Sequence, residues 1–281
     1  MIAGHLPRRE LKKTRASLVL ATAFCVVTGC SSEDTNVPDR LEGNTKDDRV
    51  TIAVAGDICE APGGETEGCR RTSDLILSHG ADWVLVAGDA QYDNGEIDNF
   101  ETVYEPTWGR FKSETLPVPG NHDQFDTGYS TYFDDAGLGD SIPQHWIKDL
   151  GTWSVTGVDS NDVAGASGFI QDNLPTPDFD IVMWHHARYS SGSDHGSDDD
   201  IDPMWEAARA GGGCINFVSH DHIYERLSYE GMQRFVVGTG GANSMTTLSK
   251  PISSRAARRR LLRCTLFCSW TFTATENTNS S

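Results

Sequence analysis

Short apolar runs alternate with amphipathic stretches along the chain from residue 49 onward. Seven runs have the length and the β-branched content of buried strands: 50–55, 82–87, 116–119, 153–158, 181–184, 215–218 and 235–237. Two further segments, 72–79 and 202–210, have apolar residues at helical spacing. Because the strands are separated by helical stretches, the pattern predicts an α/β fold with a sheet buried on at least one face.

The two ends of the chain lack this alternation. Residues 1–29 join a basic stretch to the apolar run 16–27, which is too short for a permanent membrane span and predicts a signal peptide. The sequence VTGC that ends at Cys30 resembles a bacterial lipobox, so we expect export and a lipid anchor on Cys30, with ordinary cleavage as the alternative. The protein would then sit on the outer membrane, face the periplasm or lie on the extracellular surface. We expect a flexible tether at 30–48, one domain at 49–241 and an atypical C-terminal segment at 242–281.

Charge and cysteine usage narrow the function classes. The 281 residues carry a formal net charge of −18, and an acidic surface repels nucleic-acid backbones, so we expect no nucleic-acid binding. In an oxidising compartment, Cys59 and Cys69 are expected to close a loop as a disulfide, whereas Cys214 opens an apolar run and is expected to be a buried small hydrophobe. The sequence does not indicate an oligomeric state.

Polar residues of the types that bind metals follow five of the predicted strands. In chain order these residues are Asp57, Asp89 with Tyr92, Asn121, His185, and the pair His220 and His222. The carboxyl ends of strands in an α/β sheet meet at one crevice, where ligands bind. A single Gly-Asp after a strand is usually a turn, but turns do not explain five such positions that mix Asp, Asn and His.

The donor types in this set favour transition metals. Carboxylate and amide oxygens mixed with imidazoles suit Fe, Mn or Zn, whereas sites made only of oxygen suit Mg or Ca. Two cations about 3.5–4 Å apart need a bridging carboxylate and separate ligands on each side. The set contains both, so we expect a centre with two metal ions.

The blocks GDIC, GDAQY, GNHD, VMWHH and SHDHIYER occur in this order between residues 50 and 241. In this order they resemble the calcineurin-like metallophosphoesterase superfamily, and most closely its purple acid phosphatase-like members. The resemblance implies a four-layer α/β/β/α sandwich of two mixed sheets that hydrolyses phosphate esters with a dinuclear metal-bound hydroxide. Tyr92, three residues after Asp89, indicates the purple acid phosphatase branch; packing beside the site through a hydrogen bond is its alternative role.

The resemblance also assigns roles to individual residues. Fe(III) would be bound by Asp57, Tyr92 and His222. The second ion, which could be Zn, Mn or Fe(II), would be bound by Asn121, His185 and His220. Asp89 would bridge the two ions.

Two further histidines receive catalytic roles from the resemblance. His122 would face the phosphate and stabilise the transition state or protonate the leaving group. His195 is similar to a substrate-loop histidine, with a solvated loop position as the alternative. The sequence departs from the family pattern at Ser219, where glycine is usual, and in the arginine-rich stretch after residue 252.

Other functions remain open at this stage. A phosphodiesterase or nucleotidase could use the same centre, and an inactive, metal-binding surface lipoprotein is a non-enzymatic alternative. A periplasmic solute-binding lipoprotein is disfavoured because it would not need seven residues of metal-ligand type at strand ends. The expected partner of the site is a small phosphate ester.

Overall fold

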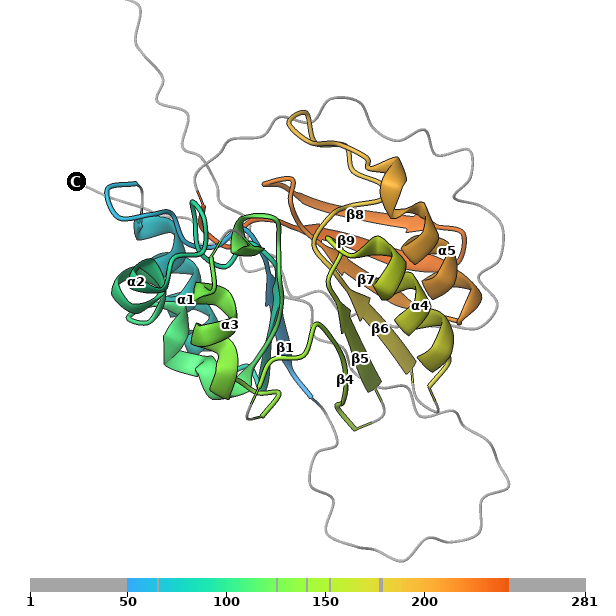
Figure 1. Ribbon diagram of the computed structural model, residues 1–281, viewed down its shortest axis with the longest axis horizontal. Helices are drawn as coiled ribbons and strands as arrows, with labels where there is room; N and C mark the ends of the chain where they lie inside the picture. Colours follow the sequence, from blue (N-terminus) through green and yellow to red (C-terminus); the bar gives the residue numbers. More distant parts are fainter. Residues whose placement is uncertain are drawn as a thin grey trace, which may run out of the picture.

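The computed structural model describes residues 50–242, except 65, 125, 140, 152, 177 and 178. Two β-sheets pack face to face, and helices cover the outer face of each sheet (Figure 1). The expected α/β sandwich is therefore confirmed. The predicted signal peptide, the tether and all but the first residue of the C-terminal segment lie outside the described residues. Among the described residues, no helix combines the length and the apolar character that a membrane span requires.

The first sheet is parallel, in the order β1-β2-β3. Two mixed sheets were expected, and the described part of this one contains no antiparallel pair. Helices connect its strands, as parallel pairing requires. Its strands are β1 (Ile52–Ala55), β2 (Trp83–Ala87) and β3 (Thr115–Val118). The connecting helices are α1 (Glu67–His79), α2 (Ile97–Asn99), the π-helix η1 (Phe100–Tyr104) and the 3₁₀ helix η2 (Trp108–Glu114).

The second sheet is mixed, in the order β4-β5-β6-β7-β9-β8. Its four central strands are parallel, and β4 and β8 pair antiparallel at its two edges. The strands are β4 (His145–Asp149), β5 (Trp153–Val158), β6 (Phe179–Met183), β7 (Ile215–Val218), β8 (Tyr224–Tyr229) and β9 (Met232–Val237). The helices of this half are α4 (Val163–Asn173), η5 (Asp199–Ile201) and α5 (Asp202–Ala210). Three short helices precede β4: η3 (His122–Gln124), α3 (Gly128–Tyr132) and η4 (Phe133–Asp135).

Three apolar layers hold the sandwich together. Successive side chains of a strand point to opposite faces, so Leu85 packs against the second sheet while Val84 packs under the helices of the first. The middle layer joins the two sheets and includes Phe217. The outer layers include Trp108 of η2 on the side of the first sheet and Trp205 of α5 on the side of the second. Four structural layers separated by three cores make the α/β/β/α sandwich.

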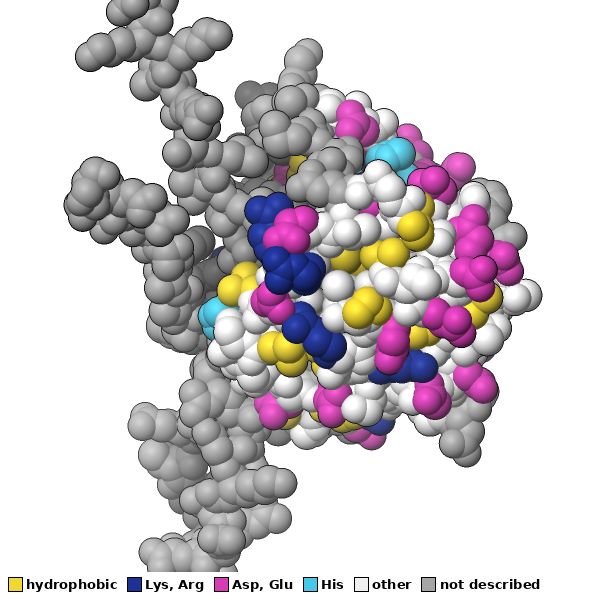
Figure 2. All heavy atoms as spheres, turned by 90° about the vertical axis from the view of Figure 1, so that its left-hand side faces the viewer, with side chains coloured by type: hydrophobic (Ala, Val, Ile, Leu, Met, Phe, Trp, Pro, Cys, Tyr) yellow, Lys and Arg dark blue, Asp and Glu magenta, His cyan; other side chains and the backbone are white. Residues whose placement is uncertain are grey.

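The helices over the first sheet carry charged side chains of both signs on their outer face (Figure 2). Arg70 pairs with Glu67 at 2.5 Å along α1, and Arg110 of η2 pairs with Asp74 of α1 at 2.8 Å. Exposed pairs of this kind contribute only about 0–1 kcal/mol each. Stability of the domain therefore rests on its three apolar layers.

Candidate metal centre

All seven predicted metal-ligand residues follow strands at one end of the sandwich. The loops after β1, β2 and β3 carry Asp57, Asp89 with Tyr92, and Asn121. The loops after β6 and β7 carry His185, His220 and His222. Parallel strands have their carboxyl ends on the same side, so the two sheets deliver these side chains to one place.

Tyr92 lies at the centre of the first group. Its hydroxyl oxygen is 3.0 Å from Asp57 Oδ1, 3.0 Å from Asp89 Oδ2 and 3.0 Å from His222 Nε2. His222 Nε2 is 3.5 Å from Asp57 Oδ1. Four donor groups thus converge on one point.

His185 lies at the centre of the second group. Its Nε2 is 3.1 Å from Asn121 Oδ1, 3.2 Å from His220 Nδ1 and 3.3 Å from Asp89 Oδ2. Asp89 therefore belongs to both groups, and the other six side chains divide three and three. This division is the one that the sequence resemblance implies.

The donor set fits two metal ions. Metal–ligand bonds of about 2.0–2.2 Å at tetrahedral or octahedral angles place neighbouring donors about 2.8–3.6 Å apart, and the separations above lie within that interval. Asp57 and Asp89 are 0% and 1% exposed. In the described part of the chain, neither carboxylate pairs with a lysine or an arginine. Buried carboxylates require such compensation, and two cations would supply it.

Burial and mutual charge shift the pKa values of these groups when no metal is present. Burial raises the pKa of Asp57. Burial lowers the pKa of His185, but the neighbouring carboxylate of Asp89 outweighs it and raises the value to about 9. Burial and repulsion from His185 lower the pKa of His220 to about 2. His220 is therefore already neutral at pH 7, whereas His185 must lose a proton before it can bind a metal.

The tautomer of His185 is fixed from behind the site. Its Nδ1 lies 3.0 Å from the carbonyl oxygen of Ala87 and 2.9 Å from Ser219 Oγ. A carbonyl oxygen only accepts hydrogen bonds, so Nδ1 carries the proton and Nε2 faces the other donors. Ser219, the residue that replaces the usual glycine, thus orients a predicted ligand.

Two glycines at this site leave room for the side chains of predicted ligands to lie against the backbone. A Cβ on Gly88 would lie 2.4 Å from His185 Nδ1, and a Cβ on Gly120 would lie 2.0 Å from Asp89 Oδ1. Gly88 has a positive φ of 92°, and so do three of the predicted ligands: Asp57 at 57°, Asp89 at 50° and His220 at 73°. The ligand residues themselves therefore adopt part of the left-handed backbone at the strand ends.

The two predicted catalytic histidines lie beside the ligands. The ring of His122 is 4.5 Å from that of Tyr92, and its Nδ1 is 2.5 Å from the carbonyl oxygen of Asp93. The ring of His195 is 3.8 Å from that of His220 and is exposed to solvent. The structure therefore brings all nine predicted site residues together.

The sequence also matches the profile of a known protein family. The sequence profile of the calcineurin-like phosphoesterases matches residues 50–224, which is more than half of the chain. The chain belongs to the calcineurin-like phosphoesterase family. No curated protein matches it in sequence.

Three solved structures share the calcineurin-like phosphoesterase fold with this chain. Purple acid phosphatase PPD1 from yellow lupin has a TM-score of 0.55 and 19% identity over 74% of this chain and 47% of its own length. GAP50, the anchor in the inner membrane complex of Plasmodium, has a TM-score of 0.51 and 16% identity over 70% of this chain and 75% of its own. A dimetal phosphatase from Danio rerio has a TM-score of 0.51 and 10% identity over 68% of this chain and 88% of its own length.

The sequence pattern predicts no role for two buried carboxylates of the calcineurin-like phosphoesterase domain. Asp123 accepts hydrogen bonds from the backbone N–H groups of Ala90 and Gly120 and so ties the loops after β2 and β3 together. Asp221 lies between two predicted ligands, is fully buried and accepts from the N–H groups of His195 and Gly196. Both stand inside motif blocks, but only the fold reveals which backbone groups they bind.

His186 is a third residue whose position the sequence left open. Its ring centre is 4.6 Å from that of His220, and its Nδ1 lies 2.8 Å from Ser160 Oγ. His185, His186 and His220 together have nitrogen atoms close enough to share an ion. His186 therefore borders the second group of donors.

The expected disulfide between Cys59 and Cys69 is absent. Both are free, buried thiols, and their sulfur atoms lie 3.6 and 3.8 Å from Thr107 Oγ1. They pack in the apolar layer between the first sheet and its helices, so Cys59 does not face the predicted ligands. Cys214 is buried as expected, but it is disulfide-bonded.

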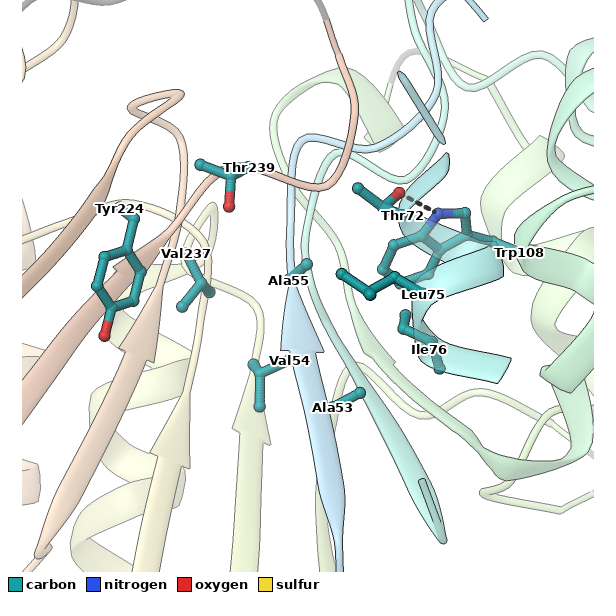
Figure 3. Close-up of a pocket in the computed structure, with 10 residues that line it drawn as sticks. All are labelled: Ala53, Val54, Ala55, Thr72, Leu75, Ile76, Trp108, Tyr224, Val237 and Thr239. Atoms are coloured by element: carbon teal, nitrogen blue, oxygen red, sulfur yellow. Dashed lines mark hydrogen bonds between the residues drawn. The ribbon is translucent and has the colours of Figure 1, made fainter. Parts of the chain in front are cut away.

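An apolar pocket lies beside β1 (Figure 3). Ala53 and Val54 of β1 form its floor, with Leu75 of α1 and Trp108 on one side and Val237 of β9 on the other. None of the nine predicted site residues lines it.

Proposed function

We propose that this member of the calcineurin-like phosphoesterase family is a metal-dependent phosphomonoesterase of the purple acid phosphatase type. One observation carries the proposal: six buried or half-buried donor side chains divide into two groups of three, and Asp89 contacts both. When bound, the two metal ions would lower the pKa of a water molecule and neutralise charge on the phosphoryl oxygens. Asp57, Tyr92 and His222 would hold the first ion, and Asn121, His185 and His220 the second.

His122 is the residue proposed to move a proton. Its Nδ1 lies close to a carbonyl oxygen, which only accepts, so Nδ1 carries hydrogen and Nε2 is the nitrogen that exchanges a proton with substrate. Its backbone N–H also donates to Asp89 Oδ1 at 2.9 Å. The loop after β3 therefore fixes this imidazole relative to the carboxylate that the two donor groups share.

Tyr92 supports iron in the first position. Burial and the two adjacent carboxylates raise the pKa of its hydroxyl well above the ordinary value, so the phenol keeps its proton unless a cation replaces it. A trivalent ion is the strongest such competitor among the metals that suit this donor set. The second group, with two imidazoles and an amide, suits Zn, Mn or Fe(II).

The decisive experiment is metal analysis combined with two substrates. We expect the purified mature protein to contain two metal ions per chain, one of them iron. We also expect it to turn over 4-nitrophenyl phosphate faster than bis(4-nitrophenyl) phosphate. Faster turnover of the diester would assign the centre to phosphodiester chemistry, and two bound metals without turnover of either ester would indicate an inactive metal-binding protein.

We further propose that the protein is exported and carries lipid on Cys30. The support is the sequence alone: a basic stretch, a short apolar run and small residues before Cys30. Metabolic labelling with a fatty acid should mark the wild type but not a Cys30→Ser variant. Fractionation should then recover the wild type with membranes and the variant without them, and equal labelling of both proteins would exclude acylation at Cys30.

A further inference from the structure

The loop that carries His195 is anchored to a carboxylate that lies between two predicted ligands. Residues 184–198 connect β6 to η5 and α5 at the end of the sandwich where the donors converge (Figure 1). Asp221 stands between His220 and His222 in the sequence. It is 0% exposed and accepts hydrogen bonds from His195 N–H at 3.1 Å and from Gly196 N–H at 2.9 Å.

The contact has the form of an anion-binding nest. Two successive backbone N–H groups point at the two oxygens of one carboxylate, and Gly196 has φ of 72°, the left-handed conformation that closes such a concavity. The Cα of Gly192 lies against the same carboxylate, because a Cβ there would come within 2.1 Å of Asp221 Oδ1. The loop is therefore shaped around Asp221.

A second carboxylate holds the start of the same loop. Glu225 of β8 accepts from the hydroxyl of Ser191 and, at 3.3 Å, from its N–H. Arg234 of β9 is fully buried and donates to Glu225 at 2.8 Å. These anchors fix the loop upstream of residue 192, and Asp221 holds the following turn together with Ser197, whose hydroxyl hydrogen-bonds to the backbone of Ser190. In that turn the ring of His195 lies 3.8 Å from the ring of His220.

We propose that Asp221 is a positioning residue that holds His195 over the metal centre and so couples the substrate-facing loop to the last pair of metal ligands. The inference rests on the proposed phosphoester hydrolase function. Asp221 acts through His195 and does not touch substrate. A loop misplaced by about 1 Å can cost as much as 10²-fold in rate, so the coupling should be measurable.

Two variants disturb the contact from opposite sides. Asp221→Asn keeps the shape but turns one acceptor oxygen into a donor that faces a backbone N–H. Gly192→Ala keeps the charge but pushes the loop off the carboxylate. Asp200→Asn, an exposed carboxylate in the helix that follows the loop, removes the same charge without the contact and serves as the control.

The kinetic test is a double-mutant cycle with His195→Ala. We expect Asp221→Asn, Gly192→Ala and His195→Ala each to lower kcat/KM by roughly 10- to 100-fold at unchanged metal content, and Asp200→Asn to have no effect. In the His195→Ala background, Asp221→Asn should cost less than about twofold further. Full, additive losses in that background, or loss of metal from Asp221→Asn, would overturn the positioning role.

Hydrogen exchange separates this proposal from the function on which it rests. The amides of His195 and Gly196 should be protected in the wild type and in Asp200→Asn and should exchange faster in Asp221→Asn and Gly192→Ala. Unchanged protection in Asp221→Asn refutes the anchor, whatever the activity. If the wild type hydrolyses no ester, the proposed function fails, and exchange alone then decides whether Asp221 holds the loop.

Discussion

The two sheets contribute different chemistry to the same centre. The loops of the parallel sheet supply only oxygen donors, from Asp57, Asp89, Tyr92 and Asn121, whereas those of the mixed sheet supply only imidazole nitrogens. Each group of donors draws on both sheets, so neither sheet could hold an ion alone. The predicted metal centre is therefore a property of the sandwich and depends on how the two sheets face each other.

The largest expected effect follows from removing the one donor that both groups share. Asp89→Ala should lose both metal ions and reduce hydrolysis to the background rate, because its carboxylate contacts Tyr92 in one group and His185 in the other. Metal content by elemental analysis and turnover of 4-nitrophenyl phosphate test this. A variant that kept two ions per chain and normal turnover would show that Asp89 does not bridge.

His122 follows a strand of the same sheet as Asp89 but is not a predicted metal ligand, so its removal should leave both ions in place. His122→Ala should retain two metals but lower turnover by roughly 10²- to 10⁴-fold, the range for a lost general acid. The same two measurements apply. Loss of an ion from this variant would make His122 a ligand and add an imidazole to the oxygen-donating sheet.

Tyr92 and Asn121 each supply an oxygen donor to only one of the two groups. Tyr92→Phe should weaken the first ion and abolish the visible absorption expected of a phenolate on Fe(III), while the second ion remains. Asn121→Ala, the matched variant, should weaken the second ion and leave the absorption intact. Visible spectra and metal counts separate the two outcomes. An unchanged band in Tyr92→Phe would rule out the purple acid phosphatase type and leave only the assignment to the calcineurin-like phosphoesterase family.

The smallest expected effect concerns the pH dependence of the metal-free protein. The pKa of His185 is raised from its ordinary value near 6.5 to about 9, chiefly because Asp89 outweighs the effect of burial. The ion pair therefore stabilises the fold fully below about pH 6.5, and this contribution is lost as the pH rises through about 9. Thermal melts of chelator-treated protein should show the midpoint falling between these pH values, and Asp89→Asn should flatten that part of the curve.

Much of the fold could be predicted because its central strands are apolar and short. The strands at 153–158 and 215–218 lie where the sequence pattern indicates. Two edge strands were missed, because HWIKD and YERLSY mix polar and apolar residues without a clear buried face. Helix α4 was also missed, since its sequence VAGASGFIQDN contains two glycines that lower helix propensity.

The candidate site was more predictable than the elements around it. Its residues follow strand ends in an ordered set of motifs, and parallel strands bring such positions together. The packing behind these site residues could not be predicted from the sequence. Ser219 orients His185 through a contact between the loops after β7 and β6, and the sulfur atoms of Cys59 and Cys69 contact Thr107, which is 38 residues further along than Cys69. Such contacts exist only once the chain is folded.

The positive φ angles of Asp57, Asp89 and His220 have a consequence for how the family can change. Each residue sits in a backbone conformation that costs a side-chain-bearing residue on the order of 1–2 kcal/mol, and glycine would relieve that cost. Replacement by glycine would therefore remove a predicted metal ligand and relieve backbone strain at the same three positions. A lineage released from selection for hydrolysis would be expected to accumulate glycine there, keeping the sandwich while its chemistry disappears.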